Sequence, residues 1–158
     1  MPVEIFVQEH ADANERLARS KVTDNARIIL ALTAIGKDVT NVGGHNLLKG
    51  LDNMAYVQTQ GINGPIFTLI ALDSHNYPTM GDVTREKLIQ VILDAQLNDG
   101  GWTLSGTKAD PDITDVAIQT GGSNTPATGD TGVLVWIIAL PVTILAAAFV
   151  LKRKEREA

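Results

Sequence analysis

The segment "TREKLIQVILDAQL", Thr84 to Leu97, decides the fold class, because its apolar residues recur at helical spacing. Thr84 is a suitable N-cap, and Glu86 places a negative charge in the first turn, where the helix dipole favours it. Four apolar residues fall on one face of this helix: Leu88, Val91, Ile92 and Ala95. The segment therefore predicts an amphipathic helix that packs on a core.

Helical signals recur along the rest of residues 1–119, and no segment there alternates as a strand would. Thr23 or Asp24 is expected to cap a helix that runs to a stop at Gly36. Asp110 is expected to cap the last helix, with Pro111 in its first turn. Besides the helix over residues 84–97, helices are thus expected over residues 23–35, after residues 43–44, from residue 64 and from residue 110. These signals predict an all-α domain.

Composition limits the functions of this domain. The 158 residues hold 13 Lys and Arg against 18 Asp and Glu, and no cysteine. An acidic body without a basic stripe argues against nucleic-acid binding, and the absence of cysteine excludes disulfides, thiolate nucleophiles and cysteine-ligated zinc. The three histidines, His10, His45 and His75, lack a metal-binding spacing. We expect neither a metal nor a cofactor.

A long apolar run lies near the C-terminus, at residues 133–151, and contains no charged side chain over nineteen positions. As a helix this run would cover roughly 28 Å, close to the hydrocarbon thickness of a bilayer. Lys152, Arg153 and Lys154 follow directly, and basic flanks stay in the cytoplasm. The sequence predicts a transmembrane helix over residues 133–151, a cytoplasmic tail over 152–158, and residues 1–132 outside.

Between the domain and this run, residues 120–132 are rich in Gly, Ser and Thr and are expected to form a flexible linker. The linker carries a pentapeptide: Thr125, Pro126, Ala127, Thr128 and Gly129. Pentapeptide, apolar span and basic tail together resemble the cell-wall sorting signal of Gram-positive surface proteins, whose usual motif is Leu-Pro-any-Thr-Gly. Thr125 departs from that motif, where leucine is usual.

This resemblance implies that sortase cuts between Thr128 and Gly129 and joins Thr128 to peptidoglycan. The alternative is a plain anchor that contacts membrane lipid only. An exported protein should begin with a signal peptide, and residues 1–20 show none. We therefore expect that the chain is a fragment of a longer surface protein or that its true start lies upstream; a tail anchor inserted after synthesis is the third option.

The stretch "QLNDGGW" carries a second resemblance, through Gln96, Gly100 and Trp102. The Gln-x₃-Gly-x-Trp spacing is similar to the repeat of squalene–hopene cyclases and protein prenyltransferases, and residues 23–119 resemble such a domain in bacterial surface proteins. The resemblance implies an α/α toroid, of which this chain would form about half a ring. It also implies a structural role for these three residues, with the glutamine amide and the indole joining neighbouring repeats, and Asp110 starting the next helix.

The same resemblance aligns Asp110 to Thr114 with the Asp-x-Asp-Asp motif of terpene cyclases, which makes Asp112 the match for the catalytic acid. Ile113 stands where the third aspartate is expected, and aromatic residues that could face a carbocation are few. We therefore expect no catalytic residue, and a non-catalytic surface module that binds an unknown extracellular ligand or protein. The alternatives are an enzyme acting on isoprenoids and a binder of a cobalamin-type small ligand.

Overall fold

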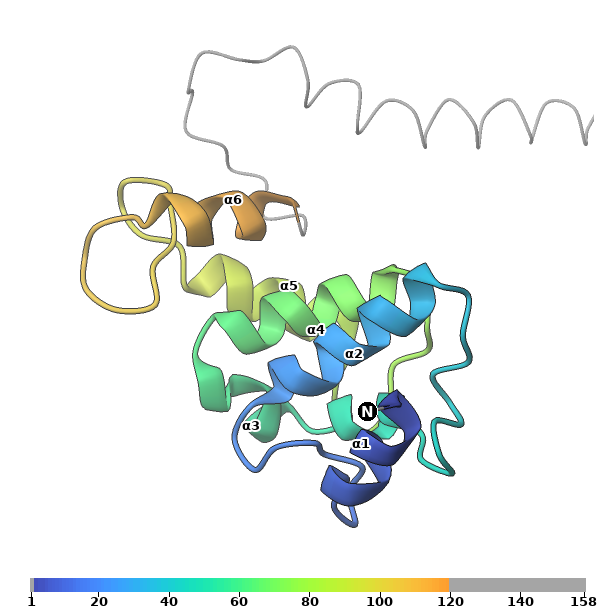
Figure 1. The fold of residues 1–158 in the computed structure, drawn as a ribbon. Helices are drawn as coiled ribbons and strands as arrows, with labels where there is room; N and C mark the ends of the chain where they lie inside the picture. Colours follow the sequence, from blue (N-terminus) through green and yellow to red (C-terminus); the bar gives the residue numbers. More distant parts are fainter. Residues whose placement is uncertain (1, 120–158) are drawn as a thin grey trace, which may run out of the picture. The chain divides into compact units, whose positions relative to one another are not determined.

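A computed structural model describes residues 2–119 of the protein, and every regular element within them is helical (Figure 1). Over this range the only β-type contact is an isolated bridge between Val42 and His45. The α-helices are α1 (Val3–His10), α2 (Val22–Ala34), α3 (Met54–Val57), α4 (Asn63–Asp73), α5 (Arg85–Asp94) and α6 (Pro111–Gln119), and the 3-10 helices are η1 (Leu47–Leu51) and η2 (Gln58–Gln60). The predicted all-α class is confirmed for this part of the chain.

Helix α4 forms the centre of the domain. Its sequence, "NGPIFTLIALD", is apolar nearly all round, and buried residues point to every side of it, among them Ile66, Leu69 and Leu72. Its most extensive contacts are with α2 and α5, and it makes smaller contacts with α3, η2 and α6. A helix without a polar face is stable only when it is enclosed, so the other helices are arranged around α4.

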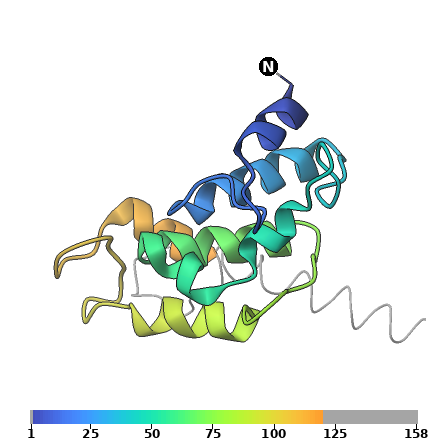
Figure 2. The ribbon, with the colours of Figure 1, turned by 90° about the horizontal axis from the view of Figure 1, so that it is seen from below.

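The long helices around α4 run in two opposite directions. In Figure 1, α2, α4 and α6 run the same way and α5 runs back between α4 and α6 in chain order. Figure 2 shows α4 between α2 and α5, in agreement with the contacts that α4 makes with both. Within residues 2–119, α4 therefore lies beside the like-directed helices α2 and α6 and beside α5, which runs the opposite way.

The start of α2 differs from its prediction. The helix begins at Val22, and Lys21 in the N-cap position makes no side-chain cap. Thr23 is buried, and its backbone N–H donates to Oε1 of Gln60 at 3.0 Å. A side chain from a distant segment thus satisfies the N–H of Thr23, and sequence-local capping rules could not anticipate this.

The other boundaries follow the sequence more closely. Gly36 has φ +69° and ends α2, with its N–H bonded to the carbonyl of Thr33. Thr84 caps α5 by accepting from the N–H of Lys87 at 3.2 Å. That helix stops at Asp94, three residues short of the expected Leu97, because residues 95–101 form the turn described below. Helix α1 was not anticipated; Val7 is its buried contact with the core.

Within residues 2–119, no helix has both the length and the apolar character that crossing a membrane requires. The predicted linker, transmembrane helix and tail, at 120–132, 133–151 and 152–158, lie outside the residues that the structure describes.

Candidate functional site: the turn between α5 and α6

Trp102 is the centre of the connection between α5 and α6. Its side chain is fully buried, and its indole N–H donates to the carbonyl of Ile92 in α5 at 2.6 Å. Its backbone carbonyl accepts from the N–H of Asp110 at 2.8 Å. Trp102 therefore joins the end of one helix to the start of the next.

Gln96 and Gly100 lie in the same turn. Nε2 of Gln96 donates to the carbonyl of Gly100 at 2.7 Å, and the N–H of Leu97 donates to the carbonyl of Gly101 at 2.8 Å. Gly100 has φ +85°, a backbone conformation that glycine adopts without a steric penalty. The structure thus brings the predicted residues of the motif together in one closed turn.

Two residues that the sequence analysis did not single out complete this turn. Asp99 accepts from the N–H of Gly101 at 3.2 Å and from the N–H of Ala109 at 3.0 Å. The bond from Ala109 has the larger effect and that from Gly101 the next, and both lower the pKa of the Asp99 carboxyl. Thr114 in α6 accepts from the N–H of Trp102 at 3.0 Å. An Asp directly before Gly-Gly is a common turn signal and could have indicated Asp99.

Gly101 marks the point of closest approach between the turn and α6. A Cβ at this position would lie 2.8 Å from Oγ1 of Thr114 and would also collide with the Cβ of Ala109. The second glycine of "DGG" is therefore required by packing, whereas the first is required by its backbone conformation.

Asp110 and Asp112, the residues aligned with a cyclase acid motif, stand at the start of α6. Oδ1 of Asp110 accepts from the N–H of Asp112 at 2.9 Å and from that of Ile113 at 3.4 Å. This geometry is that of an N-cap, as predicted for Asp110. The side chain of Asp112 is exposed to solvent. One carboxylate of the pair is thus engaged in capping, and the other faces water.

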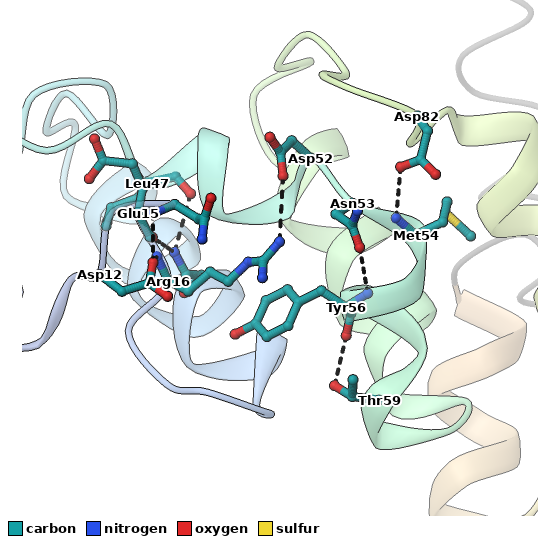
Figure 3. A network of polar contacts seen from close by, with 12 residues as sticks. Asp12, Glu15, Arg16, Leu47, Asp52, Asn53, Met54, Tyr56, Thr59 and Asp82 are labelled. Carbon is teal, nitrogen blue, oxygen red and sulfur yellow. Dashed lines mark hydrogen bonds and ion pairs between the residues drawn. The ribbon is translucent and has the colours of Figure 1, made fainter.

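A second polar network, which the sequence did not reveal, joins residues 12–16 to the segment around α3 (Figure 3). The guanidinium of Arg16 stacks on Tyr56, with its Cζ 4.2 Å from the ring centroid, and Nη2 lies 4.0 Å from Oδ1 of Asp52. The hydroxyl of Tyr56 donates to the carbonyl of Ala18 at 2.6 Å. Burial raises the pKa of Tyr56 to about 12, against the opposing effect of the Arg16 charge.

Asn25 supports the same region from inside. Its side chain is fully buried in α2; Oδ1 accepts from the N–H of Leu17 at 2.9 Å, and Nδ2 donates to the carbonyls of Glu15 at 2.7 Å and Leu47 at 3.3 Å. One amide side chain therefore satisfies the backbone of two separate segments, residues 15–17 and η1. Since Asn is common on surfaces, nothing in its local sequence indicated this role.

His10 and His45 each contact another side chain. Nδ1 of His45 lies 2.6 Å from Oε2 of Glu15, and His10 stacks on Phe6 with ring centroids 4.2 Å apart. Among the described residues, no group of three or more His, Asp or Glu side chains is placed to hold a metal ion. The pentapeptide Thr125 to Gly129 lies outside the described residues.

Comparison with known proteins adds no relative to this description: no family model matches the chain, and no curated protein or solved structure matches it significantly.

Proposed function

We propose that the chain is a non-catalytic helical binding module, displayed on the surface of a Gram-positive bacterium by its C-terminal segment. In this proposal residues 1–119 form part of an α/α toroid, and residues 120–132 present the sortase pentapeptide. Residues 133–151 cross the membrane, and the basic tail remains in the cytoplasm.

The surroundings of Asp110 and Asp112 carry the non-catalytic part of the proposal. Protonating an alkene requires a carboxylic acid that is enclosed in an apolar, water-free cavity and strengthened by its neighbours. Asp110 is engaged as the N-cap of α6, and Asp112 is exposed. Neither carboxyl group has the environment that cyclase chemistry needs, whereas both suit the start of a helix.

The arrangement of the long helices supports the toroid. An α/α toroid alternates helices between two layers, so that helices of one layer run in the same direction. The like-directed α2, α4 and α6, with α5 returning in the opposite direction, follow this pattern (Figure 1). The turn at Trp102 joins α5 to α6 as the contact between neighbouring repeats would.

The anchor is tested by wall attachment in a sortase-bearing Gram-positive host. Thr128→Ala removes the residue that sortase would join to peptidoglycan, so the chain should be released by boiling in detergent. The matched variant Thr125→Leu restores the usual first residue and should increase the wall-linked fraction. If Thr128→Ala remains linked to wall fragments after lysozyme release and boiling in detergent, the sortase proposal is wrong.

The absence of catalysis is tested separately, by incubating the purified chain with squalene and with a polyprenyl diphosphate. We expect no turnover by the wild-type chain. Turnover that Asp112→Asn abolishes, while Asp115→Asn leaves it unchanged, would contradict the non-catalytic proposal and favour the isoprenoid enzyme.

A further inference from the structure

A depression of about 320 Å³ opens on the surface where α2 and α4 end. It is lined by the last turn and C-terminal loop of α2 and by the residues that follow α4, chiefly Thr33, Gly36, Lys37, Asp38, His75 and Tyr77. Its volume is at the lower end of the range of small-ligand sites. It is separate from the turn at Trp102 and from the start of α6.

Two helix C-termini meet at this depression, and each carries a partial negative charge. Such ends are commonly complemented by a basic side chain in the last turn, but α2 and α4 both lack one there. Arg85 partly compensates for α4, since its Nη2 donates to the carbonyls of Leu72 at 3.1 Å and Tyr77 at 3.0 Å. The end of α2 receives no such contact from Arg85.

The hydrogen bonds of Thr33 fix the hydroxyl of Tyr77 as the donor of their shared bond. Oγ1 of Thr33 lies 2.7 Å from the carbonyl of Ile29 and 2.8 Å from the hydroxyl of Tyr77. A carbonyl can only accept, so the one hydroxyl proton of Thr33 goes to Ile29 and Tyr77 must donate its own proton to Thr33. The oxygen of Tyr77 is then left with lone pairs for a donor in the depression.

The remaining lining residues favour a ligand that is both a hydrogen-bond donor and a cation. Asp38 is exposed, and hydrogen bonds from the hydroxyl and the N–H of Thr40 lower the pKa of its carboxyl, so it stays ionised at neutral pH. The ring of His75 is tilted against that of Tyr77, with centroids 5.3 Å apart. Aromatic faces beside a carboxylate attract an organic cation. Lys37 is the opposing group, because its ammonium would compete for the same acceptors.

We propose that this depression binds a primary ammonium group, accepted by the hydroxyl oxygen of Tyr77 and the carboxylate of Asp38 at the C-terminal end of α2. The inference rests on the proposed binding role of the module and gives that role a ligand chemistry. Two sources supply this chemistry, the lysine side chain of a partner peptide and a free diamine.

The test titrates the full chain, kept in mild detergent and labelled with nitrogen-15, with three probes. N-acetyl-lysine methylamide represents the peptide source, cadaverine represents the free diamine, and N-acetyl-norleucine methylamide is the uncharged control. We expect saturable shifts at the amides of Gly36, Lys37 and Tyr77 with one or both ammonium probes, and none with the control. The ammonium probe that binds more tightly identifies the source.

Three variants relate binding to the named groups. Tyr77→Phe keeps the ring but removes the acceptor and should weaken binding about tenfold. Asp38→Asn removes an exposed charge and should weaken binding about threefold. Lys37→Gln removes the competing ammonium and should strengthen binding about threefold. The matched control Asp115→Asn, an exposed carboxylate of α6, should leave the affinity unchanged.

The proposal is overturned if the norleucine probe produces the same shifts, if no probe saturates, or if Asp115→Asn weakens binding as much as Asp38→Asn. Should Tyr77→Phe fail to fold, the opposite signs expected for Asp38→Asn and Lys37→Gln decide the question. Asp112, the residue that tests catalysis, does not line the depression, and the anchor is tested by a separate measurement of wall attachment. A failure here therefore leaves the surface-anchored, non-catalytic module standing, and the reverse also holds.

Discussion

Two irregular segments of the domain, residues 11–20 and 95–110, are held to the helices by different means. The first is secured by a buried amide, Asn25, which bonds to backbone groups that would otherwise be unpaired. The second is secured by a buried indole, Trp102, which supplies a large apolar surface and one donor. The two segments thus solve the same problem, the burial of non-helical backbone, with a polar and an apolar side chain.

The two segments depend on different interactions for their conformation. Segment 11–20 includes Glu15 at φ +62°, an uncommon conformation for a residue with a side chain, and its backbone depends on specific hydrogen bonds. Segment 95–110 uses glycines for its unusual conformations, so its main requirement is a side chain large enough to fill the space between α5 and α6. Loss of a hydrogen bond should therefore harm the first segment more, and loss of volume the second.

The largest effect is expected for Trp102→Ala. Removing a fully buried indole leaves a cavity and should lower the free energy of unfolding by about 3–5 kcal/mol. Trp102→Phe keeps most of the volume but leaves the carbonyl of Ile92 without its donor, so it should cost about 1–3 kcal/mol. Urea denaturation followed by circular dichroism measures both. Equal losses for the two variants would show that the indole N–H, rather than the volume, holds this turn.

Asn25→Ala should follow, with a loss of about 2–3 kcal/mol, because it leaves the N–H of Leu17 and the carbonyl of Glu15 without their side-chain partner and removes one bond to the carbonyl of Leu47. Hydrogen exchange should then quicken at Leu17 before it quickens at Trp102. The matched control Asn14→Ala alters an exposed side chain and should change stability by less than about 0.5 kcal/mol. If both variants behave alike, the amide does not secure this segment.

A smaller effect is expected at the start of α6. Asp110→Ala removes the acceptor for the N–H groups of Asp112 and Ile113 and should cost about 1 kcal/mol. Asp112→Ala removes only a favourable interaction with the helix dipole and should cost a fraction of that. Thermal unfolding of the two variants, side by side, measures the difference. A larger loss for Asp112 would mean that its carboxylate has a role beyond the one described.

A pH-dependent effect on stability is expected at Tyr56. The pKa of Tyr56 is raised from 10.0 to about 12 in the folded protein, so the folded state holds the phenol proton more tightly than the unfolded state does. The resulting stability is complete below pH 10 and is lost as the pH rises toward about 12. Urea midpoints measured across this range should fall for the wild-type chain. Tyr56→Phe should show a flatter profile, and an unchanged slope would contradict the assignment to Tyr56.

The sequence anticipated those features whose causes are local. The N-caps Thr84 and Asp110 and the stop at Gly36 depend on a residue and its next few neighbours, and all three were found where predicted. The start of α2 was mispredicted because its N–H partner, Gln60, lies far along the chain. Asn25 and Arg16 went unnoticed for the same reason, since their partners come from other segments.

The candidate site likewise has residues that the sequence indicated and residues that only the structure revealed. The resemblance implied that the amide of Gln96 and the indole of Trp102 join neighbouring repeats. In the structure the indole donates to Ile92 in α5, and the amide of Gln96 donates to Gly100 in the turn itself. Asp99 bonds to Gly101 two residues on, a local turn pattern, whereas Thr114 completes the turn through a bond to Trp102 that no spacing rule connects.

The sequence by itself determined the helical class of residues 2–119, because the period of apolar residues and the caps act within single helices. Only the tertiary structure decided that α2 and α4 end beside each other, that the hydroxyl of Tyr77 donates to Thr33, and that the carboxylate of Asp112 faces water. These properties depend on distances between residues far apart in the chain, and such distances are set when the helices pack around α4. The local sequence pattern therefore specifies the helices, whereas the packing of the helices specifies which side chains meet and which face water.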